Sequence, residues 1–68
     1  MKRREFEVDG FVVAITTERI EVETGSSIYV PPTLSPPHDF ENEPELWRLA
    51  RQAVAEYLSY AGIEPTPR

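Results

Sequence analysis

The sequence predicts an α+β fold, in which a three- or four-stranded antiparallel β-meander packs on one C-terminal amphipathic α-helix. Two patterns predict it. Apolar residues recur at helical spacing between positions 46 and 61, with charged and polar residues on the opposite face. Short segments of alternating apolar and polar residues occupy positions 4–30. A helix with so wide an apolar stripe must be covered, and a sheet with one apolar face can cover it.

The chain of 68 residues has room for a single domain with a small core. We divide it into a β-meander over 4–30, a proline-rich acidic loop over 31–43, a helix over 44–61 and a tail over 62–68. Domains of this size usually need disulfides, a metal or a partner for stability. Because the chain contains no cysteine and one histidine, we expect a protein partner or self-association as a homodimer.

The first two strands are expected to form a hairpin around Asp9-Gly10, because a type I′ turn needs positive φ at both central residues. A two-residue loop pairs Val8 with Phe11 and Phe6 with Val13. All the large apolar side chains then share one face, as the alternating pattern requires.

The second strand is expected over 11–17 and the third over 20–24. Their connection contains no glycine or asparagine, so a longer type I loop over Thr16–Arg19 is as compatible as a tight turn. Both loops keep Ile20 on the same face as Ile15, because their lengths have the same parity.

The turn Gly25-Ser26-Ser27 leads into a fourth strand, which Pro31-Pro32 ends because proline cannot donate to a ladder. We favour a three-residue loop, which directs Ile28 and Val30 toward the core and leaves Tyr29 on the outer sheet face. A two-residue loop would turn Tyr29 inward instead.

The helix is expected over 44–61. Asn42 is the expected N-cap, and Glu45, three residues later, has the spacing of a capping box. Pro44 fits the first turn, where its missing N–H is harmless. Gly62 is expected to end the helix at the C′ position.

The predicted core lies between the helix and the inner face of the sheet. The sheet contributes Phe6, Val8, Phe11, Val13, Ile15, Ile20, Val22, Ile28 and Val30. The helix contributes Leu46, Leu49, Ala50, Ala53, Val54, Tyr57 and Leu58. We expect Leu34 and Phe40 to attach the 31–43 loop to this core.

Charge and motifs argue against several function classes. A net charge of −5 argues against direct nucleic-acid binding, which needs clustered Lys and Arg. No segment has the apolar length of a membrane span or of a signal-peptide core, so we expect a cytoplasmic protein. The chain has no Gly-x-Ser-x-Gly motif and no glycine-rich phosphate loop. We therefore expect no enzyme, and no catalytic, cofactor-binding or metal-binding residues.

Two surfaces are candidates for binding a partner. Glutamates at alternate strand positions are expected on the outer sheet face, around a small apolar strip, where they could receive a basic protein. Trp47 lies at one margin of the helical stripe, and tryptophan is enriched in binding hot spots. The alternative is that the glutamates only solvate the sheet and that Trp47 only closes the core. The predicted partner-binding residues are Glu5, Glu7, Glu21, Glu23, Tyr29 and Trp47.

A competing site combines His38 with Asp39 and the glutamates at positions 41, 43 and 45. Imidazole and carboxylate groups can bind metals or perform acid–base chemistry. The segment lacks the second histidine and the i, i+4 spacing of a specific metal motif. Solvated charges in a loop are therefore the preferred interpretation.

Two stretches resemble the HicB-like antitoxins of HicAB-type toxin–antitoxin pairs. Asp9-Gly10-Phe11-Val12-Val13-Ala14 resembles the family's Asp-Gly-aromatic-Val-Ala strand. Ala53-Val54-Ala55-Glu56-Tyr57-Leu58 and then Gly62-Ile63-Glu64-Pro65-Thr66-Pro67 resemble its helix and its Gly-Glu-x-x-Pro exit. The family's Leu-Pro-Gly segment is missing, and the spacing between the two stretches is longer here. The resemblance implies a non-catalytic protein that neutralises a small, often basic, partner by covering it.

We therefore expect a small acidic protein-binding module that acts as an antitoxin, an inhibitor or an accessory subunit through protein–protein contact. One alternative is an acidic nucleic-acid mimic that blocks a nucleic-acid-binding protein. A less favoured alternative is a metal-dependent domain that uses His38 and the nearby carboxylates.

Overall fold

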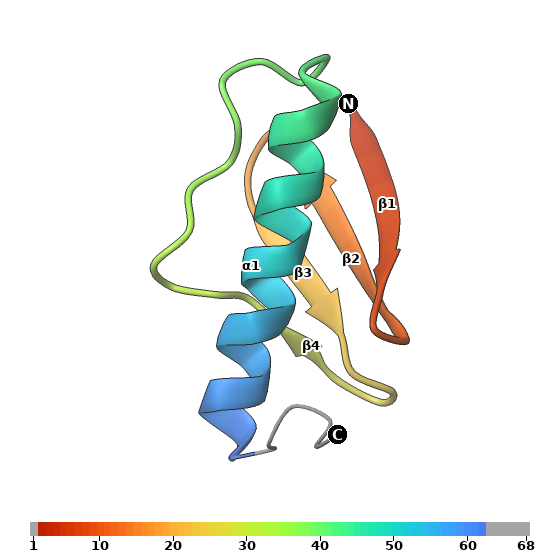
Figure 1. Ribbon diagram of the computed structural model, residues 1–68, viewed down its shortest axis with the longest axis vertical. Helices are drawn as coiled ribbons and strands as arrows, with labels where there is room; N and C mark the ends of the chain where they lie inside the picture. The colour runs from red at the N-terminus through yellow and green to blue at the C-terminus, as the bar shows by residue number, and fades with distance from the viewer. Residues whose placement is uncertain (1, 63–68) are drawn as a thin grey trace.

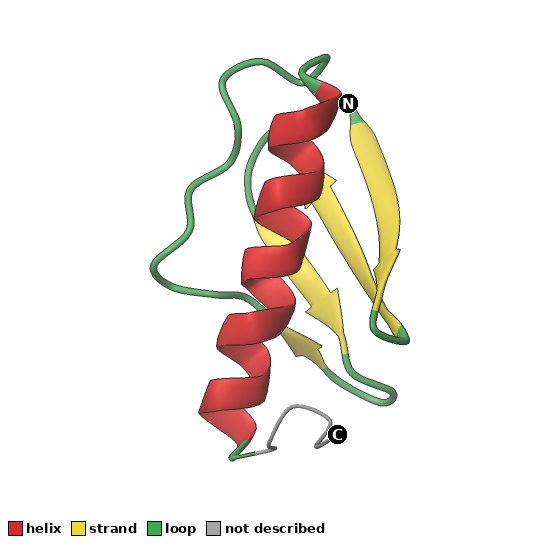
Figure 2. Ribbon diagram, viewed as in Figure 1, coloured by secondary structure: helices red, strands yellow, loops and turns green. Residues whose placement is uncertain are grey.

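A computed structural model describes residues 2–62 and shows an α+β fold with one sheet and one helix (Figures 1 and 2). The elements in chain order are β1 (Arg3–Val8), β2 (Phe11–Thr16), β3 (Ile20–Glu23), β4 (Ile28–Tyr29) and α1 (Glu43–Ala61). The strands form an antiparallel sheet in sequence order, and α1 covers one of its faces. The predicted fold class is thereby confirmed. The tail beyond Gly62 lies outside the described residues.

The first hairpin has the predicted turn and register. Asp9 and Gly10 both have positive φ, at 53° and 86°. Val8 pairs with Phe11 and Phe6 with Val13, as expected for a two-residue loop. This turn chemistry places the large apolar residues of both strands under the helix.

The connection between β2 and β3 is the tight alternative, in which Thr16 and Arg19 close a loop of two residues, Thr17 and Glu18. The Thr16 amide donates to the Arg19 carbonyl at 3.0 Å, and the Thr16 hydroxyl accepts from the amides of Glu18 and Arg19 at 3.1 Å each. Side-chain hydrogen bonds of this kind let threonine close a turn without glycine. Ile15 pairs with Ile20, so the two side chains lie on the same face of the sheet, as predicted.

The turn before β4 differs from the favoured prediction. The Thr24 amide donates to the Ser27 carbonyl at 2.9 Å, and Val22 pairs with Tyr29, so the loop has two residues rather than three. Tyr29 consequently faces α1, while Ile28 and Val30 are 57% and 43% exposed. Their predicted places in the core, and that of Tyr29 on the outer face, were wrong.

The physical reason for this register lies in the turn and in the helix above it. Gly25 has a φ of 89°, which a two-residue hairpin turn accepts at its first central position. The two-residue loop also brings the Tyr29 ring within 5.5 Å of Tyr57 on α1, measured between centroids. An aromatic pair replaces the aliphatic contacts that the three-residue loop would have made.

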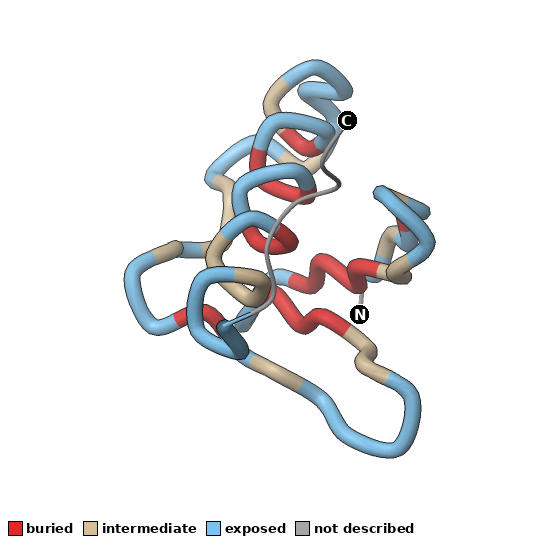
Figure 3. The backbone as a smooth tube through the Cα atoms, turned by 60° about the horizontal axis from the view of Figure 1, so that its bottom comes forward, coloured by how far each residue is buried: buried red, intermediate tan, exposed pale blue. Residues whose placement is uncertain are grey.

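The core lies between α1 and the inner face of the sheet, where Figure 3 shows the buried residues gathered. Its buried members are Phe6, Val13, Ile15, Ile20, Val22, Leu46, Leu49, Ala50, Ala53 and Val54. The other predicted members, apart from Ile28 and Val30, are partly buried and pack at its rim, as do Leu34, Phe40 and Tyr29. The 31–42 segment therefore attaches to the core through the two predicted apolar residues.

Both helix ends match their sequence signals. The Asn42 side chain accepts a hydrogen bond from the Glu45 amide at 3.3 Å. The Glu45 carboxylate binds Arg48, at 2.5 Å and 3.2 Å, so only half of the expected capping box is formed. Pro44 lies in the first turn, and Gly62 ends the helix with a φ of 74°.

Candidate protein-binding surfaces

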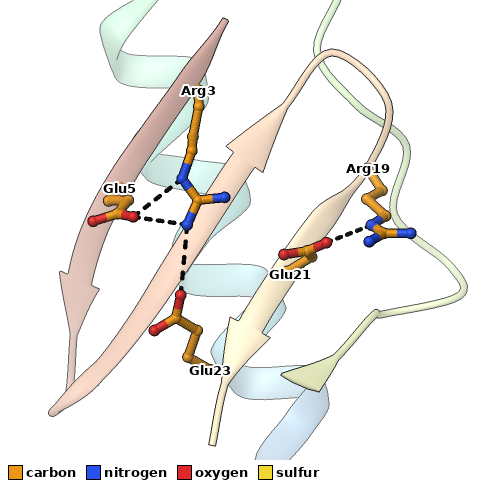
Figure 4. Close-up of polar contacts among 5 residues, drawn as sticks. All are labelled: Arg3, Glu5, Arg19, Glu21 and Glu23. Atoms are coloured by element: carbon orange, nitrogen blue, oxygen red, sulfur yellow. Dashed lines mark hydrogen bonds and ion pairs between the residues drawn. The ribbon is translucent and has the colours of Figure 1, made fainter. Parts of the chain in front are cut away.

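The outer face of the sheet is covered by long charged side chains instead of a second layer. The central strand presents the small residues Val12, Ala14 and Thr16 there, and Ala14 is fully buried although no helix lies over it. Arginine and glutamate side chains from the neighbouring strands extend across this strip (Figure 4). Their aliphatic parts can shield apolar surface while the charged groups remain in water.

Arg3 links two of the four predicted glutamates. Its guanidinium donates to the Glu5 carboxylate at 2.7 Å and 3.1 Å, and lies 3.6 Å from the Glu23 carboxylate (Figure 4). The hydrogen bonds that Arg3 donates to Glu5, together with the charges of Glu5, Glu21 and Glu23, raise the pKa of Arg3. The residue therefore remains a fixed cation in the middle of an acidic face.

Glu21 is paired with a second cation, Arg19. This carboxylate is only 8% exposed and accepts a hydrogen bond from the Arg19 guanidinium. Arg3 and Arg19 are residues that the sequence analysis missed. Arg3 precedes Glu5 by two positions within β1, so strand periodicity could have placed that pair on one face. Arg19 lies in the turn before β3, where strand periodicity gives no such signal.

The outer face is thus of mixed charge. Glu5, Glu7, Glu21 and Glu23 all lie on it, as the register predicts. Within residues 2–62, Glu7 is the one of the four for which the structure shows no ion pair.

Trp47 forms the margin of α1 above β1. It is 38% exposed, and its indole meets the buried Phe6 ring at a centroid distance of 4.7 Å and an interplanar angle of 72°. The Arg4 guanidinium lies 5.1 Å from the centroid of the same Phe6 ring. It also donates two hydrogen bonds to the Glu43 carboxylate, at 2.7 Å and 2.8 Å, which lowers the pKa of Glu43. The Phe6 ring, itself buried and in contact with Arg4, thus supports one edge of the partly exposed indole.

At the opposite margin of α1, two helix tyrosines meet Tyr29 of β4. Tyr29 stacks on Tyr60 at 4.8 Å and packs against Tyr57, whose ring lies 5.4 Å from Phe11. Tyr60 is 73% exposed. Desolvation of the Tyr29 hydroxyl is the main cause that raises its pKa, and the nearby charge of Glu56 raises it further.

The described residues contain no group of three His, Asp or Glu side chains placed to hold a metal ion. His38 is exposed in the loop. Asp39, its neighbour, accepts a hydrogen bond from the Glu41 amide at 3.0 Å, which is a local turn contact. No helix of the described chain is long and apolar enough to cross a membrane.

Among the described residues, an open hollow of about 420 Å³ lies between β1 and the loop, and another of the same volume lies between the loop and α1. One is lined by Lys2, Arg3, Arg4, Phe40 and Glu41, the other by Thr33, Leu34, Gln52, Ala55, Glu56 and Ser59. Each lies beside the 31–42 segment. Their polar groups can bind by hydrogen bonds or charge, but neither lining combines a nucleophile with a histidine base.

Comparison with protein-family models, with curated proteins and with solved structures found no match to the chain. The resemblance to HicB-like antitoxins therefore rests on the two sequence stretches alone. Part of the second stretch, residues 63–67, lies outside the described residues.

Proposed function

We propose that this protein is a non-enzymatic protein-binding module, which acts by covering its partner as an antitoxin, an inhibitor or an accessory subunit does. The observation that carries the proposal is the partly exposed indole of Trp47, fixed on the Phe6 ring at the margin of the helix. A large aromatic side chain held in this way can enter a partner's pocket with little loss of conformational entropy.

The outer sheet face supports the same proposal through its charge. Glu7 extends from the edge strand without an ion pair in the described structure, and Glu23 shares its cation with Glu5. These carboxylates can steer a basic partner toward the sheet. Arg3 and Arg19 interrupt the acidic surface, which favours a protein partner over the alternative of a nucleic-acid mimic.

The test begins with chemical cross-linking in host lysate and identification of the protein captured. The affinity of the purified pair is then measured for the wild type, Trp47→Ala and Gln52→Ala, an exposed change about 140° around the helix from Trp47. We expect Trp47→Ala to weaken binding by about 2 kcal/mol or more and Gln52→Ala to have little effect. Equal affinities for all three proteins would show that the Trp47 margin is not the binding surface.

A further inference from the structure

The two edges of the sheet differ in how well they are protected. β4 has only two residues, and Pro31-Pro32 follows closely, so this edge offers almost no ladder to another strand. β1 has six residues without proline, and no described segment runs along its outer side (Figures 1 and 2). An unpaired strand of this length is a template for another strand.

The unpaired backbone groups of β1 belong to three residues. The turn after β1 makes Val8 and Phe11 a hydrogen-bonded pair, and such pairs alternate along an antiparallel ladder. The even-numbered residues of β1 therefore direct their N–H and C=O groups toward β2. The odd-numbered residues, Arg3, Glu5 and Glu7, direct theirs to the free edge.

We propose that β1 pairs antiparallel with β1 of a second copy of this chain, about a two-fold axis at Glu5, so that two four-stranded sheets form one continuous sheet. In this register Glu5 faces Glu5 of the partner subunit, and Arg3 faces Glu7 of the partner subunit. All three free residues then form hydrogen-bonded pairs. A shift by two residues in either direction pairs one of them with a residue outside β1.

Side-chain charge selects the same register. Each Arg3 lies directly opposite a Glu7 carboxylate, and opposite charges at facing positions stabilise an antiparallel pair. One shifted register would oppose Glu5 to Glu7. The other would oppose Arg3 to Glu5, but it would also place the two Arg4 residues opposite one another in a closely spaced, non-hydrogen-bonded pair. The facing Glu5 carboxylates are the unfavourable pair in the proposed register, and the 2.7 Å hydrogen bond from Arg3 offsets their charge.

The joint, meaning the paired β1 strands of the two copies, also gains apolar contact on the side of the sheet that faces α1. Arg4 of one copy lies opposite Phe6 of the partner subunit, a ring that the Arg4 guanidinium already approaches within its own chain. Trp47 packs on Phe6, so one partly exposed indole from each copy flanks the joint. Self-pairing thus adds buried area to a core that is small for a domain standing alone.

This inference goes beyond the proposed function, since it concerns self-association and requires no second protein. Sedimentation equilibrium of the full chain tests it directly. We expect the wild type to reach twice its chain mass of 7.8 kDa as its concentration rises to the millimolar range. A wild type that remains monomeric in that range would overturn the proposal.

A proline at position 5 tests whether the free edge of β1 makes the contact. Glu5→Pro removes an N–H that points away from β2, so the internal ladder keeps its hydrogen bonds while the joint loses two. We expect a folded monomer, recognised by circular dichroism. Glu5→Thr is the matched control, because it keeps the N–H and removes the facing carboxylates, and it should dimerise at least as well as the wild type.

A charge swap tests the register and remains informative if the proline variant unfolds. Arg3→Glu and Glu7→Arg, made singly, each place like charges opposite one another and should weaken the dimer about tenfold. The double variant restores opposite charges at both positions and should regain most of the lost affinity. A dimer unaffected by Glu5→Pro, or a double variant as weak as the single ones, would show that the chains pair elsewhere.

Discussion

The Trp47 indole and the Phe6 ring meet edge to face, with their centroids 4.7 Å apart. Trp47 lies near the start of α1 and Phe6 in the middle of β1, so the pair fixes the beginning of the helix over the edge strand. Contacts of this geometry stabilise a fold by about 0.5–1.5 kcal/mol beyond the area they bury. Because Phe6 is buried and Trp47 is partly exposed, the contact joins the core to a surface available for binding.

Leu49→Ala should remove a large part of the stability of the domain. Leu49 lies on the buried face of α1 against the sheet, and truncating a buried leucine costs about 2–5 kcal/mol. Urea denaturation monitored by circular dichroism measures the loss, with the exposed Arg51→Ala as control. A variant that melts within about 2 °C of the wild type would contradict the burial of this side chain.

The register of β4 can be tested with two neighbouring alanine variants. Tyr29 packs against Tyr57 and Tyr60, so Tyr29→Ala should destabilise the fold by about 2 kcal/mol. Ile28 is 57% exposed, and Ile28→Ala should change the free energy of unfolding by no more than about 0.5 kcal/mol. Thermal denaturation compares the two variants. A larger loss for Ile28→Ala would favour the three-residue loop instead.

That turn shows where sequence periodicity reaches its limit. The Asp9-Gly10 signal specifies one loop length, so turn chemistry and apolar alternation agree, and the whole first hairpin could be predicted. Gly25-Ser26-Ser27 accepts two loop lengths of opposite parity, and each turns different residues inward. The choice depends on the fit of Tyr29 against Tyr57, a contact between segments far apart in the sequence.

The candidate surfaces could be predicted to a similar extent. Strand alternation placed Glu5, Glu7, Glu21 and Glu23 on the outer face, and helical spacing placed Trp47 at the margin of the stripe. Neither strand alternation nor helical spacing could predict the ion pair of Arg3 with Glu23. This contact runs diagonally across β2, from the first strand to the third. Such diagonal contacts depend on sheet twist and on side-chain length.

Stability should depend on pH through the ion pair of Glu43 with Arg4. The hydrogen bonds from Arg4 lower the pKa of Glu43 below its ordinary value of 4.5. A lowered carboxyl pKa stabilises the folded state above the unfolded pKa, and this contribution is lost as the pH falls through the folded pKa. The stability difference between the wild type and Glu43→Gln should therefore be present at neutral pH and vanish in acid.

Urea denaturation at a series of pH values measures this difference. Glu18→Gln is the control, because Glu18 is exposed and the described structure shows no ion pair for it. Its curve should run closer to that of the wild type throughout. A difference for Glu43→Gln that stays constant from neutral pH into acid would show that the ion pair contributes nothing.

The outer face should become more attractive to cations when Arg3 is removed. Arg3→Gln leaves Glu5 and Glu23 without their shared guanidinium, while the free energy of unfolding should change little because the pair is exposed. An oligolysine probe should then associate faster than with the wild type. The gain should shrink with added salt, which screens exposed charges beyond about 8 Å at physiological ionic strength.

Arg51→Gln separates a local effect from a change in net charge. It removes one positive charge, as Arg3→Gln does, but from the exposed side of α1. Stopped-flow measurements at protein concentrations below those of self-association compare the two variants. A faster rate for Arg3→Gln alone would locate the attraction at the carboxylates of the sheet, since both proteins carry the same total charge. Equal rates would mean that the probe responds to the charge of the whole molecule and that the outer sheet face has no special part in steering a basic partner.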